Sequence, residues 1–126
     1  MISLESLKSH IHTKPATTEE TPFDPEVLVF KVLGKMYALI AWEEEPLSIS
    51  LKCEPEEAVL LRQKYPSITP GYHLNKPHWN TILLAGSIPD DENFEMIADS
   101  YELVVEKLPK RDQAKLLDIG KEKESA

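Results

Sequence analysis

Two hydrophobic periods alternate along this chain, and each change of period marks a new element. Leu4, Leu7 and Ile11 recur at the three- and four-residue spacing of an amphipathic helix, and Ser3 stands where a capping residue is expected. Residues 13–25 contain threonine and proline without a helical or strand period. We therefore expect a connection there.

A strand-rich region comes next. Residues 27–42 are rich in β-branched and aromatic residues, with one interruption around Gly34, which tolerates a positive φ. We expect a hairpin that turns at residues 33–35. Residues 47–52, which read LSISLK, alternate strictly between apolar and polar and predict a third strand. The hairpin strands are apolar at nearly every position, so the second face of the sheet is either partly covered or a binding surface.

The next two elements are a helix and a strand. Residues 54–65 have a proline and two glutamates at positions 55–57, which suit a helix N-terminus, and Pro66 ends the pattern. Residues 80–86, which read NTILLAG, predict a fourth strand.

Helices complete the chain. We expect Asp90 or Asp91 to cap the longest helix and Pro109 to break it. Its apolar stripe consists of Phe94, Ile97, Ala98, Tyr101, Val104, Val105 and Leu108. Residues 110–120 predict a short last helix that ends at Gly120.

This order of elements predicts an α+β fold. Short turns between neighbouring strands imply a mostly antiparallel sheet with helices packed on one face, which makes a two-layer sandwich. A chain of 126 residues suits one modest core. We therefore expect a single domain over residues 1–119 and a solvated C-terminal tail over residues 120–126.

Composition narrows the class of protein. The hydrophobic fraction of 41% favours a globular chain, and no apolar run reaches the roughly 20 residues that span a bilayer. The N-terminus lacks the unbroken apolar stretch of a signal peptide. The single cysteine, Cys53, excludes an intrachain disulfide and any zinc site that needs two cysteines. We expect a cytoplasmic monomer without membrane contact.

Charge is distributed unevenly. The net charge is −8, which opposes binding to nucleic acid and anionic membranes overall. Residues 58–89 nevertheless contain no Asp or Glu, although the chain's average would place about 5.6 carboxylates there. That segment contains Arg62, Lys64 and Lys76 and has a formal charge of +3.

The acid-free segment contains the string PGYHLNKPHWN at residues 70–80, which we call the central motif. Its candidate ligand-binding side chains, with the two cations that precede it, are Arg62, Lys64, Tyr72, His73, Asn75, Lys76, His78 and Trp79. Exposed aromatic rings here would stack on a planar ligand, whereas buried ones would anchor the loop to the core. Asn75 before Lys76 and Pro77 also suits an ordinary turn with a solvated lysine.

Catalysis and cofactor binding have little support in the sequence. There is no nucleophile elbow, and none of the four glycines falls in a phosphate-binding spacing. The two histidines of the string are too few for a metal site, which needs three or four ligands. We therefore expect no catalytic residue, no metal and no cofactor. A ligand pocket or enzyme would need His73 and His78 to converge with Cys53 or Ser50.

Several strings occur together in one order: VFKVLGKMYALI, ISLKC, PGYHLNKPHWNTI, and SY within the longest helix. In this they resemble the MmcQ/YjbR family of small bacterial proteins from about Ser3 to Leu117, most specifically over Gly71 to Thr81. The chain departs from the family's frequent glycines at Leu33 and Asp24. The resemblance implies a sandwich similar to the CyaY, or frataxin-like, fold. It also implies DNA binding, which has been proposed for the family.

The leading expectation is a non-enzymatic binding module that binds DNA through the Gly71–Thr81 loop. Lys76 would contact phosphate, Asn75 and His78 would donate or accept hydrogen bonds, and Tyr72 or Trp79 would stack. Three phosphate contacts predict a salt slope of about −3, and so weak, salt-dependent binding. One alternative is a protein-interaction module that uses an exposed sheet face. The other is a small-ligand binder or enzyme with a His73/His78 pocket.

Overall fold

The strands form one antiparallel sheet. The computed structural model describes residues 2–21, 26–43, 45–71, 74 and 76–125, of which 76 and 120–125 are described by their backbone only. Within these residues the strands are β1 (Thr17–Glu20), β2 (Val27–Val32), β3 (Lys35–Ala41), β4 (Ser48–Lys52), β5 (Ile68–Pro70) and β6 (Trp79–Leu83). Their order across the sheet is β1-β2-β3-β4-β6-β5, and all neighbours are antiparallel.

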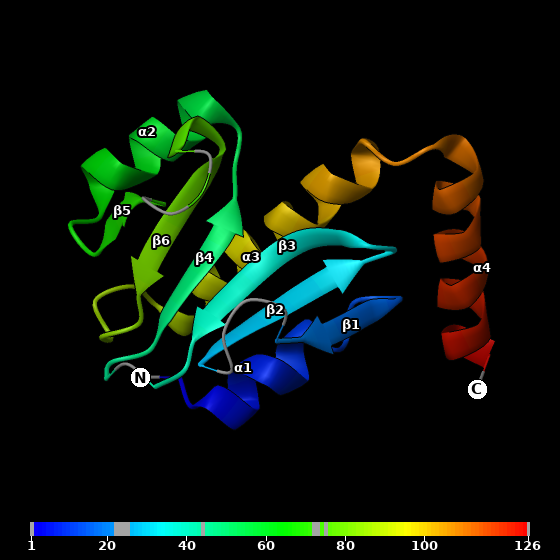
Figure 1. Cartoon of the computed structure of the whole chain (residues 1–126), viewed down its shortest axis with the longest axis horizontal. Helices are drawn as coiled ribbons and strands as arrows, with labels where there is room; N and C mark the ends of the chain where they lie inside the picture. The colour runs from blue at the N-terminus through cyan, green and yellow to red at the C-terminus, as the bar shows by residue number, and fades with distance from the viewer. Residues whose placement is uncertain (1, 22–25, 44, 72–73, 75, 126) are drawn as a thin grey trace.

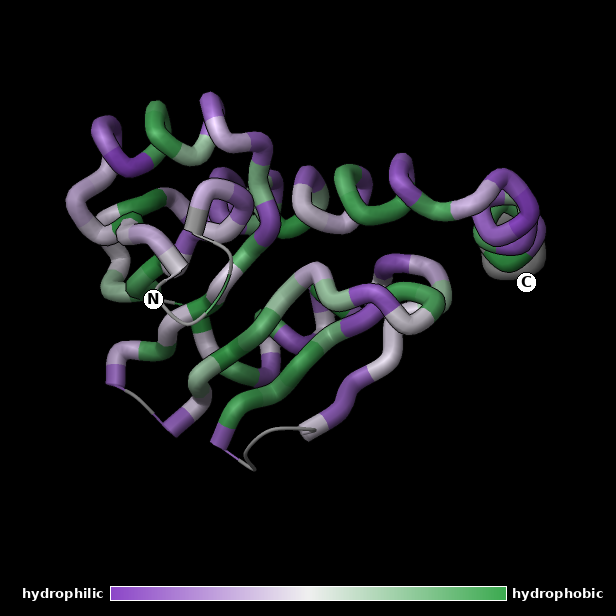
Figure 2. Tube along the Cα trace, turned by 45° about the horizontal axis from the view of Figure 1, so that its top comes forward, coloured by the Kyte–Doolittle hydropathy of each residue, from purple (hydrophilic) through white to green (hydrophobic). Residues whose placement is uncertain are grey.

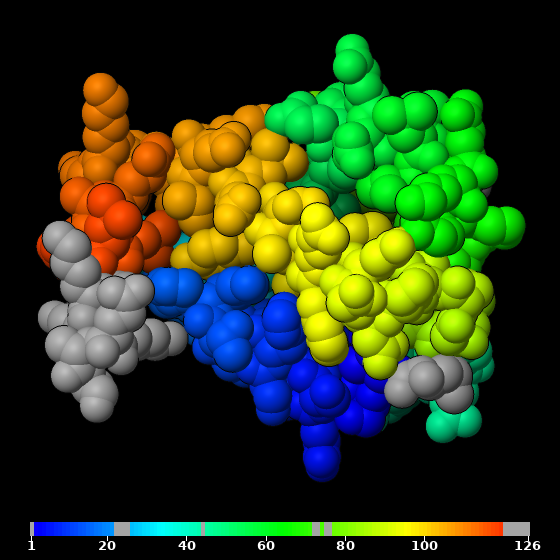
Figure 3. Space-filling view, turned by 180° about the vertical axis from the view of Figure 1, so that it is seen from behind, coloured from blue at the N-terminus to red at the C-terminus, as the bar shows by residue number. Residues whose placement is uncertain are grey.

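Helices cover one face of this sheet. The helices in the described part of the chain are α1 (Leu4–Ile11), α2 (Pro55–Lys64), the short 3₁₀ helix η1 (Lys76–His78), α3 (Asp90–Glu106) and α4 (Lys110–Ser125). Helices α1, α2 and α3 lie on the same side of the strands (Figures 1 and 3), and α4 stands at one end of the molecule. The α+β, two-layer prediction is confirmed. No helix in the described part of the chain is long and apolar enough to cross a membrane.

The main core lies between the sheet and the helices. From the strands it takes side chains such as Phe30, Ile40 and Ile82, and from the helices Leu7 and Ile97, each no more than 2% exposed. The longest runs of hydrophobic residues lie in the central strands (Figure 2). Burial of these side chains supplies most of the stability of a fold of this size.

The hairpin confirms the turn expected from Gly34. Leu33 has φ 46° and Gly34 has φ 84°, so both central residues of the turn are in the left-handed region. That combination defines a type I′ turn, whose twist matches the right-handed twist of β2 and β3.

The other face of the sheet has its own apolar cluster. Val29, Leu39 and Trp79 are buried there, and Leu74 is among the partly buried side chains that pack against them. This explains why the hairpin strands are apolar on both faces. The centre of this face is therefore covered.

The SY string of α3 has a structural purpose. Ser100 is fully buried and its Oγ donates to the backbone oxygen of Tyr37 at 2.6 Å while accepting from the backbone N–H of Lys52 at 2.9 Å. Tyr101 donates from its hydroxyl to the backbone oxygen of Pro15 at 2.8 Å. These bonds attach α3 to β3, to the end of β4 and to the segment before β1.

Two short strands were not predicted. β1 lies in the segment expected to be a connection, and it pairs with β2 at the edge of the sheet. Three of its four residues are exposed, so no apolar alternation reveals it. β5 has only three residues and pairs with β6 at the opposite edge. Edge strands of this kind form because a neighbour offers free backbone groups, which local sequence does not report.

Two predicted helix ends were wrong: the N-cap of α3 and the C-terminal end of α4. Pro89, not Asp90 or Asp91, occupies the N-cap of α3, and no side chain caps it. The two aspartates instead lie in the first turn, where their negative charges interact favourably with the positive end of the helix dipole. Helix α4 continues through Gly120 to Ser125. The Lys and Glu residues that follow are good helix formers, and they offset the roughly 1 kcal/mol cost of one glycine. A domain boundary near residue 119 stays a prediction.

Candidate functional site

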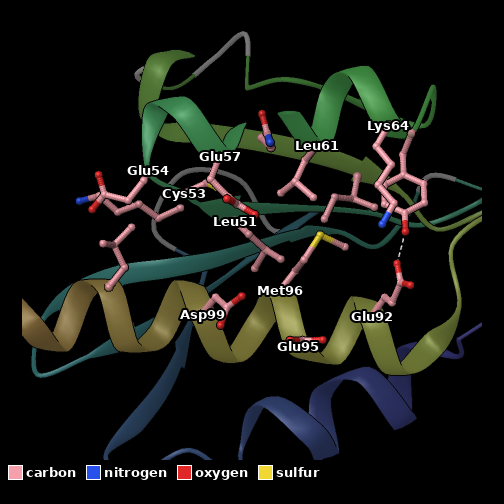
Figure 4. A pocket seen from close by; sticks show the side chains of 15 residues that line it. Leu51, Cys53, Glu54, Glu57, Leu61, Lys64, Glu92, Glu95, Met96 and Asp99 are labelled. Carbon is pink, nitrogen blue, oxygen red and sulfur yellow. Dashed lines mark hydrogen bonds between the residues drawn. The ribbon is translucent and has the colours of Figure 1, made fainter. Parts of the chain in front are cut away.

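A cleft of about 480 Å³ lies between α2 and α3. It opens on the helical side of the molecule, as a recess between α2 and the yellow-to-orange α3 (Figure 3). Strands β4 and β6 provide its floor, and the two helices provide its walls (Figure 4). The lining side chains are Leu51, Lys52, Cys53, Glu54, Glu57, Leu61, Lys64, Tyr65, Asn80, Ile82, Glu92, Glu95, Met96, Asp99 and Leu103. We call this space the α2–α3 cleft.

Asn80 of the central motif holds the α2 wall against the sheet. It is 2% exposed. Its Oδ1 accepts from Arg62 Nη1 at 2.8 Å, and its Nδ2 donates to the backbone oxygen of Ala58 at 3.3 Å. A buried amide paired at both ends fixes the distance of α2 from β6. The width of the cleft therefore depends on this residue.

The walls of the cleft are strongly acidic. Five carboxylates line it against two lysines, so its formal charge is −3. Burial raises the pKa of Asp99, and the neighbouring carboxylates Glu95, Glu102 and Glu57 raise it further. Glu57 belongs to α2 and Asp99 to α3, so negative charge faces negative charge across the cleft (Figure 4). The cleft is a place where a cation would relieve repulsion.

One end of the cleft is closed by a paired group. The hydroxyl of Tyr65 donates to the carboxylate of Glu92 (Figure 4). Lys64 lies with its Nζ 5.0 Å from the centre of the Tyr65 ring. The Tyr65 side chain, and then Glu92, raise the pKa of Lys64. The unpaired negative charge is therefore at the other end, around Glu57 and Asp99.

Cys53 lies at that acidic end. Burial raises the pKa of its thiol to about 11, with Glu57 and Asp99 adding to the effect. A thiol with this pKa is protonated at neutral pH, so it is not an activated nucleophile. Its backbone N–H donates to the backbone oxygen of His78 at 2.8 Å, which ties the cleft to the central motif.

The acidic residues do not form a metal site. In the part of the chain that the structure describes, no group of three or more His, Cys, Asp or Glu residues is placed to hold a metal ion. The α2–α3 cleft therefore offers distributed negative charge above an apolar floor, which suits an organic cation better than a bare ion.

A second cavity has the opposite charge. It has a volume of about 400 Å³ and is lined by Lys35, Met36, Lys52, Trp79, Val104, Lys107 and Leu108. Its three lysines come from β3, from β4 and from the residue that follows α3, and none of the described residues that line it is acidic. Among the described residues these lysines form no ion pair. We call this cavity the lysine hollow. Lys52 lines both cavities.

The structure separates the residues that the sequence grouped. Tyr72, His73 and Asn75 lie outside the described residues, and Lys76 is described only as the first residue of η1. Their predicted roles stay predictions. His78 is half-buried at the end of η1.

The structure gives each of the two cations of α2 a neighbour, and their predicted roles in ligand binding stay predictions. Arg62 is half-buried and directed at Asn80, and Lys64 stands at the α2–α3 cleft beside Glu92. Trp79 is only 7% exposed and packs with Val29 and Leu39. The interpretation of this tryptophan as an anchor is confirmed, so its ring is not free to stack on a base.

The predicted pocket of His73 and His78 with Cys53 or Ser50 stays a prediction, because His73 lies outside the described residues. Ser50 Oγ lies 2.8 Å from Thr81 Oγ1 and does not line the cleft that contains Cys53. Strand alternation places Ser50 on the face opposite Ile49 and Leu51, which belong to the main core.

Sequence reasoning missed most residues of both cavities. One signal was available: Glu92, Glu95 and Asp99 follow the i, i+3, i+7 spacing of a single helix face, opposite the apolar stripe of α3. Nothing local signals the lysine hollow, because its lysines are distant from one another in the sequence.

Comparison with known proteins supports the resemblance. The YjbR family model matches residues 12–103. The chain is 42% identical over 95 residues to the uncharacterized protein YbdF of Escherichia coli O157:H7, covering 75% of this chain and 78% of YbdF. It is 31% identical over 118 residues to the uncharacterized protein YjbR of Escherichia coli strain K12, covering 94% of this chain and 100% of YjbR.

Solved structures agree with the sequence matches. The crystal structure of Deinococcus radiodurans protein DR2400, a DUF419 domain, has a TM-score of 0.86 and 44% identity, covering 92% of this chain and 88% of that chain. A crystal structure of a Pseudomonas syringae protein has a TM-score of 0.68 and 31% identity, covering 81% of this chain and 98% of that chain. From the extent of the family match and these relatives, the chain belongs to the YjbR family.

Proposed function

We propose that this protein is a binding domain whose α2–α3 cleft takes a small organic cation. The observation that carries the proposal is a cleft of about 480 Å³ whose apolar floor is surrounded by five carboxylates and two lysines. A concave, partly apolar cavity with a few convergent charged groups is the usual form of a small-molecule site.

The cleft's two surfaces suit the two parts of such a ligand. Leu51, Ile82 and Met96 offer apolar contact for a hydrocarbon body. Glu57 and Asp99 offer charge for an ammonium or guanidinium group near Cys53. The pKa of Asp99 is raised first by burial and then by the nearby carboxylates Glu95, Glu102 and Glu57, and this second cause supports the placement. An anionic ligand would be repelled by the same groups.

Calorimetric titration with spermidine, agmatine and a neutral diol of similar length tests the proposal. The site variant combines Glu57→Gln with Asp99→Asn. The control variant combines Glu5→Gln with Asp118→Asn, which changes net charge equally away from the cleft. We expect the amines to bind to wild-type and control protein, the site variant to bind at least about tenfold more weakly, and the diol not to bind. Equal binding by the two variants would contradict the proposal.

A second candidate function is DNA binding through the lysine hollow. One observation favours it: Lys35, Lys52 and Lys107 converge around Trp79 of the central motif without an acidic residue in the described lining. The hairpin and the third strand thus border one cationic surface. Lys76 starts η1, which directly precedes Trp79 in the chain. Three phosphate contacts give a salt slope of about −3.

Titration with single- and double-stranded DNA at about 50 and 200 mM salt tests this function. The hollow variant combines Lys35→Ala, Lys52→Ala and Lys107→Ala. The control triple variant, with the same change in net charge, combines Lys8→Ala, Lys14→Ala and Lys115→Ala. We expect salt-sensitive binding that the hollow variant loses and the control retains. Binding that both triple variants weaken equally would indicate net charge alone and would exclude a site at the hollow.

A further inference from the structure

We infer that the lysine hollow holds a terminal phosphate monoester, such as the 5′-phosphate of a nucleotide or of a nucleic-acid end. The inference rests on the second candidate function, DNA binding, and narrows the ligand from a phosphate backbone to one terminal phosphate group. The experiment below can refute monoester binding without refuting DNA binding.

The shape of the cationic surface points to a single group. A duplex backbone presents a row of phosphates on a convex surface, and proteins meet it with cations spread along that row. Here three lysines, from the start of β3, the end of β4 and the residue that follows α3, surround one cavity of about 400 Å³. A cavity of that size encloses one phosphate and the group attached to it.

The charge of the hollow matches a monoester better than a diester. A phosphate monoester carries about −1.5 to −2 at pH 7 and has three strong acceptor oxygens, whereas each internal phosphate of DNA carries a single charge. The charged groups that face the cavity are Lys35 of β3, Lys52 of β4 and Lys107 after α3. As point charges with rotatable donors, three ammonium groups together can neutralise a dianion.

The other residues that line the hollow would contact the group attached to the phosphate. Met36, Trp79, Val104 and Leu108 are all apolar. Trp79 is 7% exposed, and Val104 and Leu108 are 4% and 6% exposed. These three side chains line the cavity while largely buried, so the ligand body lies against an apolar rim and is not stacked on the indole face.

Calorimetry with adenosine 5′-monophosphate, its methyl phosphodiester and adenosine tests the charge requirement. The protein contains two tryptophans, so the Trp42→Phe variant leaves Trp79 as the single fluorescent reporter of the hollow. Titrations at pH 5 and pH 7 bracket the second ionisation of the monoester, near pH 6. The methyl ester cannot ionise a second time, and it therefore controls for titration of the protein.

We expect the monophosphate to bind and to change Trp79 fluorescence, with adenosine inactive. If the second charge tightens binding about fivefold, the affinity at pH 5 falls about threefold, because only about a tenth of the ligand is then doubly charged. The methyl ester's affinity should change much less with pH. The hollow variant loses binding, and the control triple variant keeps it.

Two arms distinguish the sources of the monoester. Short single-stranded oligonucleotides with and without a 5′-phosphate are compared with the free nucleotide. Preference for the phosphorylated end, or binding of the free nucleotide alone, supports the inference and identifies the source. Equal binding of both oligonucleotides at the hollow would overturn the inference while leaving DNA binding in place. Absence of binding by every phosphate ligand would overturn both.

Discussion

Replacing Asn80 tests whether the central motif acts by positioning α2. Asn80 accepts a hydrogen bond from Arg62 at 2.8 Å and donates to the backbone oxygen of Ala58 at 3.3 Å. In Asn80→Ala the charge-assisted bond is lost, at a cost of about 1.5–3 kcal/mol. The longer bond to Ala58 contributes about 0.5–1 kcal/mol. Arg62 is only half-buried and water can replace its partner, so we expect a loss of about 2 kcal/mol, near the lower limit of the sum.

Urea unfolding of Asn80→Ala, Arg62→Met and the double variant measures this coupling. Arg62→Met leaves the buried Oδ1 of Asn80 without its partner, so it too should destabilise by about 1–3 kcal/mol. The double variant should cost less than the sum of the two, with a coupling energy of about 1–2 kcal/mol. Additive losses, or a loss under about 0.5 kcal/mol for Asn80→Ala, would refute the reasoning. A cation bound in the α2–α3 cleft should also be held more weakly when α2 is released.

Three further predictions follow from the cleft and from α3. The raised pKa of Asp99 means that its contribution to stability is present below its ordinary pKa and is lost as pH rises through the raised value. Asp99→Asn should therefore stabilise the protein by about 0.5–1 kcal/mol at pH 7 in thermal unfolding. That gain should disappear below about pH 4, and a destabilised variant at pH 7 would contradict it. The pKa of Cys53, about 11 instead of 9.0, gives about 100-fold less thiolate, of which greater nucleophilicity recovers about tenfold. Alkylation at pH 8 should thus be about tenfold slower than for a free thiol and faster in Glu57→Gln, and an ordinary rate would disprove the burial argument. Tyr101→Phe removes the bond to Pro15 and should cost about 1 kcal/mol in urea unfolding, while an unchanged midpoint would show that this bond contributes nothing.

Most of the helices and strands could be predicted from the pattern of residues within short segments. The helix ending at Ile11, the hairpin at Gly34 and the alternating strand at residues 48–52 each depend on periodicity or backbone geometry that a short segment carries by itself. The family resemblance, carried by strings spread over the chain, was also confirmed. The same local logic failed for β1 and β5, because an edge strand is stabilised mainly by the backbone of its neighbour.

Only the tertiary structure decided which charged and aromatic side chains lie close together. Residue pattern indicated that Arg62, Lys64 and Trp79 belong with the central motif, yet the fold turns Arg62 toward Asn80, Lys64 over the Tyr65 ring and Trp79 into an apolar cluster. Periodicity reports which side of an element is apolar, and it does not report which elements meet. The α2–α3 cleft depends on two helices separated by about a quarter of the chain, and the lysine hollow on side chains from residues 35, 52 and 107. Packing of α3 across β3 and the end of β4, through Ser100, brings those charges together.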